Sequence, residues 1–238
     1  MKRVGENTIV LTNKPKILCT ASLVGEMEAE GNLGKYFDSV VTAERFGTKS
    51  WEKAESKMQK QVVAQLLGKS GKKAEDIDLI YGGDLLNQCI GTSFGLMDFN
   101  IPFFGLYGAC STMCEALCLS SMAVDGGYAT NVIAVTSSHF ASSERQFRFP
   151  LEYGGQRPPT AQHTVTGSGG AIISNEDGDI AITHITPGKI TDMGIKDANN
   201  MGAAMAPAAI DTITKHFKDR KIDKDYYDAW RQNLDGEF

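Results

Sequence analysis

Long apolar runs and secretion signals are missing from this 238-residue sequence. No stretch approaches the roughly 18 uninterrupted apolar residues of a membrane-spanning helix. The basic start, MKRVGENTIVLTN, lacks the apolar segment and the small-residue cleavage site of a signal peptide. We therefore expect synthesis in the cytoplasm, with any membrane association made through a partner.

Disulfide patterns and basic clusters are missing as well. The five cysteines show no disulfide-like framework, and their odd number favours a reducing compartment. The net charge is −5, and arginines are not interleaved with aromatic residues in a basic cluster. Nucleic acid is therefore not an expected partner.

The rest of the composition, 42% hydrophobic and 22% charged, is ordinary for a soluble globular protein. The segment 50–71 has apolar residues at the helical period, with Ser50 at its start and Gly68 and Gly71 at its end. Further helices are expected within residues 84–100, 110–127 and 192–228. Strands are expected at 8–11 and 16–21 (as a pair), 76–83, 101–108, 131–139, and twice within 167–190, turning at Asp177-Gly178. Alternating strands and helices predict an α/β protein with a central sheet.

Residues 192–228 echo the earlier segment that begins at residue 50. In both segments an amphipathic helix ends in a lysine-rich turn, and an acidic pair follows. This pattern predicts a second copy of the same strand–helix unit, beginning near Thr191 and stopping almost at once.

Three cysteines, Cys110, Cys114 and Cys118, are spaced four residues apart. Cys110 follows Gly108-Ala109 at a strand-to-helix turn, where free N–H groups lower a thiol pKa and favour a reactive thiolate. The alternative is a small buried residue at a tight turn. A straight helix cannot close three thiolates around one ion, and no histidine or carboxylate completes a site, so no metal is expected. Cys114 and Cys118 are interpreted as packing residues on a small-residue helix.

Five motifs carry a resemblance: GDLLNQ, GACST, SSH…ERQFRFP.EYGGQRP, TVTGSGG and MGAAMAPAAIDTI. Together they resemble the stage V sporulation protein AD family of the thiolase superfamily, from about Trp51 to Tyr227. The resemblance implies a fold of two repeated halves in five layers, α/β/α/β/α, that is dimeric when intact. It assigns residues 1–190 to the N-terminal half and 191–238 to an incomplete start of the C-terminal half. Because AWRQNLDGEF makes a poor strand, a truncated or frame-altered product is expected.

The resemblance also implies a function. Relatives in this family are expected to bind dipicolinic acid (pyridine-2,6-dicarboxylate) and to support its uptake into the developing spore, without catalysing a reaction. Implied partners are other stage V sporulation membrane proteins, with peripheral association at the spore inner membrane. No cofactor is implied, although Ca²⁺ could accompany the ligand.

A flat dianion needs N–H and O–H donors, a cation and apolar walls for its ring. The turn 108–111 offers a helix N-terminus, and Arg145 and Arg148 are cations near a strand tip, unless they pair with Glu144 or Glu152. Asp84 either caps the following helix or holds Ca²⁺ bound with the ligand. The expected ligand-binding residues are Asp84, Asn87, Cys110, Ser111, His139 and Arg145.

Two alternatives remain. The first is an acyltransferase or condensing enzyme that uses Cys110 as its nucleophile. In this superfamily the histidine partner comes from the second half, which is missing here. His139 could face the Cys110 pocket, whereas His184 is expected to be at the surface or in packing, and His163 and His216 to be solvated. The second alternative is a structural subunit of a dimer that binds neither ligand.

Overall fold

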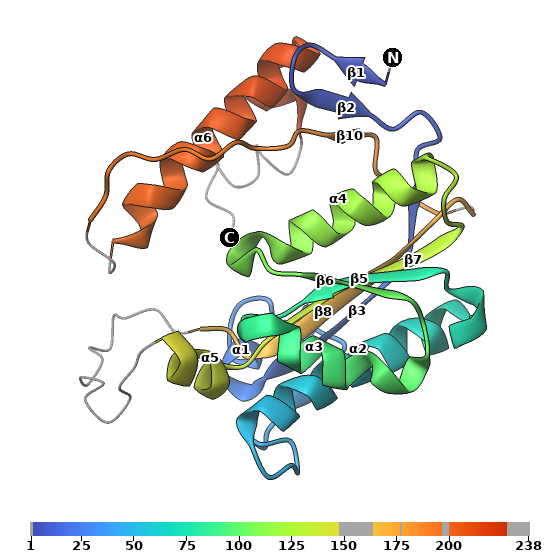
Figure 1. Ribbon diagram of the computed structural model, residues 1–238, viewed down its shortest axis with the longest axis vertical. Coiled ribbons are helices and arrows are strands. Elements are labelled where there is room, and N and C mark those ends of the chain that lie inside the picture. The colour runs from blue at the N-terminus through green and yellow to red at the C-terminus, as the bar shows by residue number, and fades with distance from the viewer. Residues whose placement is uncertain (1, 148–163, 177, 197–199, 228–238) are drawn as a thin grey trace. The chain divides into compact units, whose positions relative to one another are not determined.

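The computed structural model describes residues 2–147, 164–176, 178–196 and 200–227, without the side chains of residues 145–147 and 201 (Figure 1). Contacts divide the chain into two compact units. Residues 13–182 form the first, here called the sheet unit. Residues 1–12 and 183–238 form the second, here called the terminal unit.

A seven-stranded sheet is the centre of the sheet unit. Six strands follow the order β4-β3-β8-β7-β5-β6, and β9 pairs with β3. Their bounds are β3 Lys16–Gly25, β4 Ser39–Val41, β5 Leu79–Gly83, β6 Phe103–Leu106, β7 Asn131–Ser138, β8 Gly167–Ser174 and β9 Ile180–Ala181. β4 runs parallel to β3, β6 and β7 run parallel to β5, and β8 runs antiparallel to both β3 and β7. The carboxyl ends of β3 to β7 therefore share one edge, here called the carboxyl edge.

Helices cover both faces of this sheet. α2 (Trp51–Ser70) and α3 (Ile90–Leu96) lie on one face, and α4 (Thr112–Asp125) lies on the other (Figure 1). The core under α2 joins Met58, Val62 and Leu66 to buried strand residues such as Ile133 and Ile172. Because β5 and β7 are covered on both sides, they are nearly continuous apolar runs in the sequence. Two short helices follow strands at the carboxyl edge, α1 (Glu26–Ala29) after β3 and α5 (Phe140–Phe147) after β7.

Short 3₁₀ turns join these elements: η1 Gly34–Tyr36, η2 Ala74–Asp76, η3 Asn87–Cys89, η4 Met97–Phe99 and η5 Ala109–Ser111.

The terminal unit combines a small sheet and one long helix. Its strands are β1 (Arg3–Val4), β2 (Thr8–Val10) and β10 (His184–Ile185), in the order β1-β2-β10, and its helix is α6 (Met201–Arg220). The Asp219 carboxylate accepts hydrogen bonds from three successive backbone N–H groups, those of residues 6, 7 and 8, at 2.8–3.1 Å. This one side chain therefore ties the N-terminal hairpin to α6.

The two long helices repeat the same local pattern. α2 ends at a left-handed Gly71, and a 3₁₀ turn follows at residues 74–76. α6 ends at a left-handed Lys221, and η7 (Lys224–Tyr226) follows. Each boundary in the second pattern lies 150 residues after its counterpart in the first. The predicted echo is confirmed for this helix and turn, while the assignment of 1–190 and 191–238 to two halves of the intact fold stays a prediction.

The α/β class is confirmed, and so is the start of α2, where the Ser50 hydroxyl accepts the N–H of Lys53. Gly71 ends this helix, whereas Gly68 lies inside it. The helix predicted for 84–100 is wrong in length, because Gln88 and Cys89 adopt left-handed φ angles of 62° and 52° and leave only Ile90–Leu96 as α-helix.

Two strand pairings were predicted wrongly. Strand 8–11 does not pair with strand 16–21, because β2 pairs with β1 and β10 while β3 belongs to the large sheet. The expected hairpin across Asp177-Gly178 is also wrong, since β8 and β9 both pair with β3 instead of with each other. The second partner of β2, which is β10, and the partner of β9, which is β3, are distant in the sequence, and local turn signals do not reveal such pairings.

Replacing Asp219 tests the anchoring of the N-terminal hairpin. Burial tends to raise the pKa of Asp219, but the backbone N–H groups of residues 6–8 outweigh it and hold the pKa at about 2. The ionised form is therefore favoured in the folded state, and its stabilisation is complete above about pH 4 and lost as the pH falls towards 2. In Asp219→Asn we expect amide hydrogens 6–8 to exchange at least about tenfold faster at pH 7. Asp211→Asn, which weakens ion pairs with Lys215 and Lys189 but touches none of residues 6–8, is the control. Equal exchange rates in the two variants would show that the anchor is unimportant.

Candidate functional site

Five of the six predicted ligand-binding residues follow the carboxyl ends of three neighbouring parallel strands. Asp84 and Asn87 follow β5, Cys110 and Ser111 follow β6, and His139 follows β7. The sixth, Arg145, lies in α5, directly after β7, and its side chain is outside the described residues, as is all of Arg148. The topology thus brings the predicted residues to one edge of the sheet.

Asp84 is buried and organises the loop that follows β5. Its Oδ1 accepts the N–H of Leu86 at 2.8 Å. Its Oδ2 accepts the N–H of Thr92 at 2.7 Å and the Thr92 hydroxyl at 2.6 Å. Thr92 lies in the first turn of α3, so Asp84 satisfies an amide that the helix itself cannot. This is the capping role considered from the sequence, and it engages both carboxylate oxygens.

Asn87 and the turn 108–111 form an exposed polar strip beside this loop, here called the polar strip. The Tyr107 hydroxyl donates to Asn87 Oδ1 at 3.3 Å and so links the loop after β5 to the end of β6. Ala109 has a φ of 48°, an uncommon angle for a residue other than glycine, which turns the chain into α4. Cys110 and Ser111 follow it and are exposed. Left-handed φ angles at Gln88, Cys89 and Ala109 thus gather at this part of the edge.

His139 is buried, 3% exposed, and holds two segments together. Its Nδ1 accepts the N–H of Ala141 at 3.2 Å, and its Nε2 lies 2.7 Å from the carbonyl oxygen of Glu44. Because Nδ1 is an acceptor here, the ring proton sits on Nε2 and donates to that carbonyl. The neutral ring therefore fastens the loop after β4 to the end of β7.

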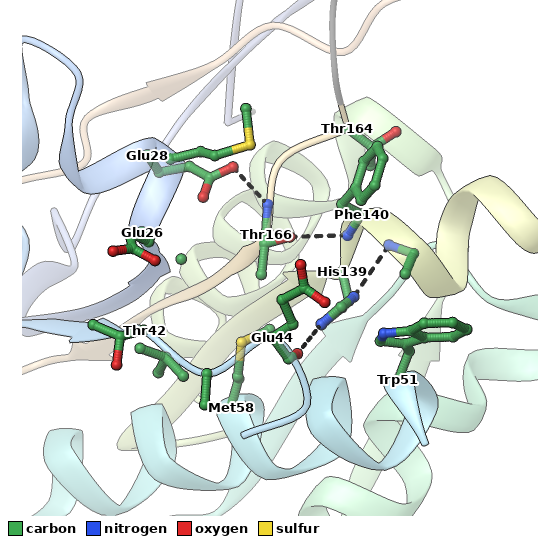
Figure 2. A pocket seen from close by; sticks show the side chains of 15 residues that line it. Glu26, Glu28, Thr42, Glu44, Trp51, Met58, His139, Phe140, Thr164 and Thr166 are labelled. Carbon is green, nitrogen blue, oxygen red and sulfur yellow. Dashed lines mark hydrogen bonds between the residues drawn. The ribbon is translucent and has the colours of Figure 1, made fainter. Parts of the chain in front are cut away.

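His139 lines a cavity of about 260 Å³ (Figure 2). The walls are largely apolar and include Met27, Val41, Met58, Trp51 and Phe140. The side chains of Glu26, Glu28 and Glu44 also face this space, and Glu28 accepts the N–H of Thr166 at 2.9 Å. Asp84, Asn87, Cys110 and Ser111 are not among the described residues that line it. The predicted residues therefore divide between two places on the carboxyl edge.

Sequence reasoning missed Glu55, which is fully buried in α2. Its Oε1 accepts the Ser137 hydroxyl at 3.1 Å and its Oε2 accepts the Ser142 hydroxyl at 2.8 Å. Burial raises the pKa of Glu55 to about 7, and the nearby negative charge of Asp84 adds to this, while the two serines act against it. The available signal was position, since Glu55 lies three residues before Met58 and thus on the apolar stripe of the helix.

Gln59 extends this polar group one turn further along α2. Its Nε2 donates to the carbonyl oxygen of Gly83 at 3.3 Å and to the Thr92 hydroxyl at 3.2 Å. Thr92 in turn donates to Asp84. Two hydrogen-bonded groups therefore lie next to each other, Glu55 with Ser137 and Ser142, and Gln59 with Thr92 and Asp84. We refer to these six side chains together as the buried polar cluster.

In α4, which contains Cys114 and Cys118, the burial of the cysteines differs in part from the prediction. The buried small-residue face of α4 comprises Ala116, Ser120 and Ala123, while Cys114 is exposed and Cys118 is half-buried. The packing interpretation is therefore wrong for Cys114. Burial raises the pKa of the Cys118 thiol, with Cys114 and Glu115 adding to the effect. In the described part of the chain, no group of three or more His, Cys, Asp or Glu side chains could hold a metal ion.

Two of the remaining histidines, His184 and His216, make side-chain hydrogen bonds. His216 was predicted to be solvated, which is wrong. Its Nδ1 lies 2.6 Å from the Thr186 hydroxyl and its Nε2 lies 2.6 Å from the Tyr227 hydroxyl, within the terminal unit. His184 is half-buried in β10, with Nδ1 2.9 Å from the Thr183 hydroxyl. His163 lies outside the described residues. Among the described helices, none has the length and apolarity needed to cross a bilayer.

Several solved structures of condensing enzymes resemble this chain. The 3-oxoacyl-[acyl-carrier-protein] synthase III of Aquifex aeolicus VF5 matches with a TM-score of 0.46 and 16% identity, over 69% of this chain and 55% of that one. The priming β-ketosynthase of the R1128 polyketide pathway matches with a TM-score of 0.45 and 18% identity, over 74% and 53% of the two chains. The chain spans little more than half the length of these proteins.

Sequence comparison is more specific. The profile of the family described as Stage V sporulation protein AD matches residues 5–231. Stage V sporulation protein AD of Bacillus subtilis (strain 168) is 46% identical over 228 residues, which cover 96% of this chain and 68% of that protein. The chain belongs to the stage V sporulation protein AD family.

Replacing Asp84 tests whether this residue organises the edge. Asp84→Asn keeps the size of the side chain but replaces one acceptor oxygen with a donor, so one of the buried N–H groups of Leu86 and Thr92 loses its partner. We expect a loss of about 1–3 kcal/mol in the free energy of unfolding, measured by urea denaturation. Asp98→Asn, which removes an exposed ion pair with Lys60, is the control and should change stability by less than about 0.5 kcal/mol. Similar values for both variants would contradict the structural role of Asp84.

Proposed function

We propose that the protein binds dipicolinic acid and supports its uptake into the developing spore. Membership of the stage V sporulation protein AD family is the observation that carries this proposal, because it supports a role in sporulation. The ligand, its transport and the association with other stage V sporulation proteins at the spore inner membrane go beyond that membership and belong to the proposal.

Electrostatics favour the polar strip over the cavity as the binding place. Dipicolinate is a dianion, and the cavity presents the carboxyl groups of Glu26, Glu28 and Glu44, which would repel it. The polar strip offers neutral hydrogen-bonding groups on Asn87 and Ser111. One carboxylate, that of Glu115, lies beside Gly108 of the strip, compared with three around the cavity. The Tyr107 ring, 52% exposed, is a flat surface for the pyridine ring.

Ca²⁺ is not part of the proposed site. Both oxygens of Asp84 already accept hydrogen bonds within the protein, so its carboxylate is poorly suited to binding a cation that arrives with the ligand. The proposal therefore gives Asp84 a structural role. The cation that balances the ligand is expected from Arg145, which α5 brings to the same edge of the sheet.

A homodimer is proposed for the intact protein, as the resemblance implied. β6 is the edge strand of the described sheet, and its Phe104 is 54% exposed although it stacks on Tyr81. An open strand edge with an exposed aromatic residue suits pairing with a second copy.

Calorimetry tests the ligand and its place. Dipicolinate should bind saturably, and Ser111→Ala should weaken binding about tenfold because one hydrogen-bonding group is lost. Thr130→Ala, an exposed residue at the opposite edge of the sheet, should leave affinity unchanged. Benzene-1,3-dicarboxylate, which lacks the ring nitrogen, should bind more weakly. No heat at millimolar dipicolinate would refute the proposal.

Acyl transfer by Cys110 is the second candidate, favoured by its exposed position directly after the strained Ala109. The three histidines in the described residues make their contacts elsewhere: His139 with Glu44 and Ala141, His184 with Thr183, and His216 with Thr186 and Tyr227. We therefore expect no acyl adduct on Cys110 after incubation with acyl-CoA, as measured by mass spectrometry. Adduct formation at a catalytic rate, lost in Cys110→Ala, would favour the enzyme instead.

A further inference from the structure

The buried polar cluster contains a carboxyl group that neither proposed function uses. Glu55 is 0% exposed and accepts hydrogen bonds from two neutral hydroxyl groups, Ser137 at the end of β7 and Ser142 in α5. Among the described residues, no lysine or arginine side chain makes a hydrogen bond or an ion pair with it. A buried carboxylate without a cation is costly, so this position favours the protonated form.

The charged groups on the surrounding elements do not change this balance. Asp84, at the end of β5, is the charged group that acts on Glu55, and its charge is negative. A Cβ atom at Gly91 would lie 3.2 Å from Asp84 Cγ and 3.5 Å from Glu55 Cδ, so the two carboxyl groups face the same helix position. β7 and α3 contain no titratable residue within their bounds. His139 is engaged with Glu44, and the buried Glu144 of α5 accepts the Thr164 hydroxyl at 3.2 Å. Arg145 follows in α5, with its side chain outside the description.

Both protonation states of Glu55 fit the same surroundings. The ionised carboxylate accepts from both serine hydroxyls, and the protonated carboxyl can donate to one of them, because a hydroxyl group rotates to act as donor or acceptor. Its pKa of about 7 places the change between these states near neutral pH. The proton can therefore be gained or lost without unfolding this end of α2.

We propose that Glu55 is a proton-binding residue of the dianion site, so that binding of dipicolinate at the carboxyl edge is accompanied by uptake of one proton from solvent. The link is electrostatic and structural. The loop 84–87 runs from Asp84, whose charge acts on Glu55, to Asn87 of the polar strip. Two negative charges on the ligand make the ionised form of Glu55 less favourable. By thermodynamic reciprocity, protonated Glu55 binds the dianion more tightly. This inference rests on the proposed function.

Calorimetry in two buffers of different ionisation enthalpy measures the proton. At pH 7 the wild-type protein should take up a fraction of a proton per ligand, and its affinity should fall about tenfold between pH 6 and pH 8, where the ligand itself stays a dianion. Glu55→Gln keeps the size of the side chain without the charge. It should bind without proton uptake, with a pH-independent affinity close to the wild-type value at pH 6. Glu75→Gln, an exposed glutamate, is the control and should behave as wild type.

Ser142→Ala separates the titration from general packing. Without this hydroxyl donor the ionised form of Glu55 is less stable, so the pH dependence of binding should move to higher pH while binding at pH 6 is kept. Wild-type binding without proton uptake, or full uptake in Glu55→Gln, overturns the inference and leaves the proposed function intact.

The titration of Glu55 can also be followed without ligand, which separates the two hypotheses. Its pKa is raised from 4.5 to about 7 in the folded state, so wild-type thermal stability should decline, relative to Glu55→Gln, as the pH rises from about 4.5 through 7, and should level off above that. If dipicolinate does not bind at any pH, the proposed function fails, together with its coupling to the proton. Parallel melting temperatures of the two proteins from pH 5 to pH 8 would overturn the proton-binding role itself.

Discussion

The close approach of α2 to the sheet is the constraint on which the carboxyl edge depends. β8 lies between β3 and β7, and its Gly170 faces α2. A Cβ atom there would lie 3.0 Å from Leu66 Cδ1 and 3.3 Å from Val62 Cγ1, tighter than ordinary packing. The missing side chain lets α2 lie directly on the strand. Its first turns then reach the ends of β5 and β7, where Gln59 bonds the Gly83 carbonyl and Glu55 meets Ser137.

The same edge carries two environments of different charge. Around β3, β4 and β7 the cavity is apolar with three glutamates, and His139 closes one side of it. Around β5 and β6 the surface residues Asn87, Tyr107 and Ser111 are polar and neutral, and one carboxylate, that of Glu115, lies beside Gly108. Because the strands are parallel, the polar residues after each strand come to one edge, but each loop sets its own direction. The predicted residues therefore lie at one edge of the sheet but do not line a single pocket.

Local signals in the sequence predicted local structure well. The bounds of α2 were predicted from the Ser50 cap, the helical period of its apolar residues and Gly71. The strands β5 and β7 were predicted from their runs of apolar residues. Pairings between distant segments could not be predicted, because β2 finds its partner β10 more than 170 residues away. Left-handed φ angles at Gln88 and Cys89 make α3 shorter than the helix predicted for 84–100. Neither residue is a glycine, so these angles had no signal in the sequence. For the site, strand ends located Asp84 and His139, but the burial of Glu55 depends on packing that no single segment contains.

The terminal unit has a consequence for synthesis. Its strands β1 and β2 are translated before the partners that complete them, β10 and Asp219 of α6, which lie more than 170 residues later in the sequence. Closing so long a loop carries an entropic cost that grows only slowly with length, but it cannot happen before β10 and α6 have been translated. Residues 13–182 contain all strands of the large sheet and can assemble beforehand. β1 and β2 thus acquire these partners only after every strand of the large sheet has been translated.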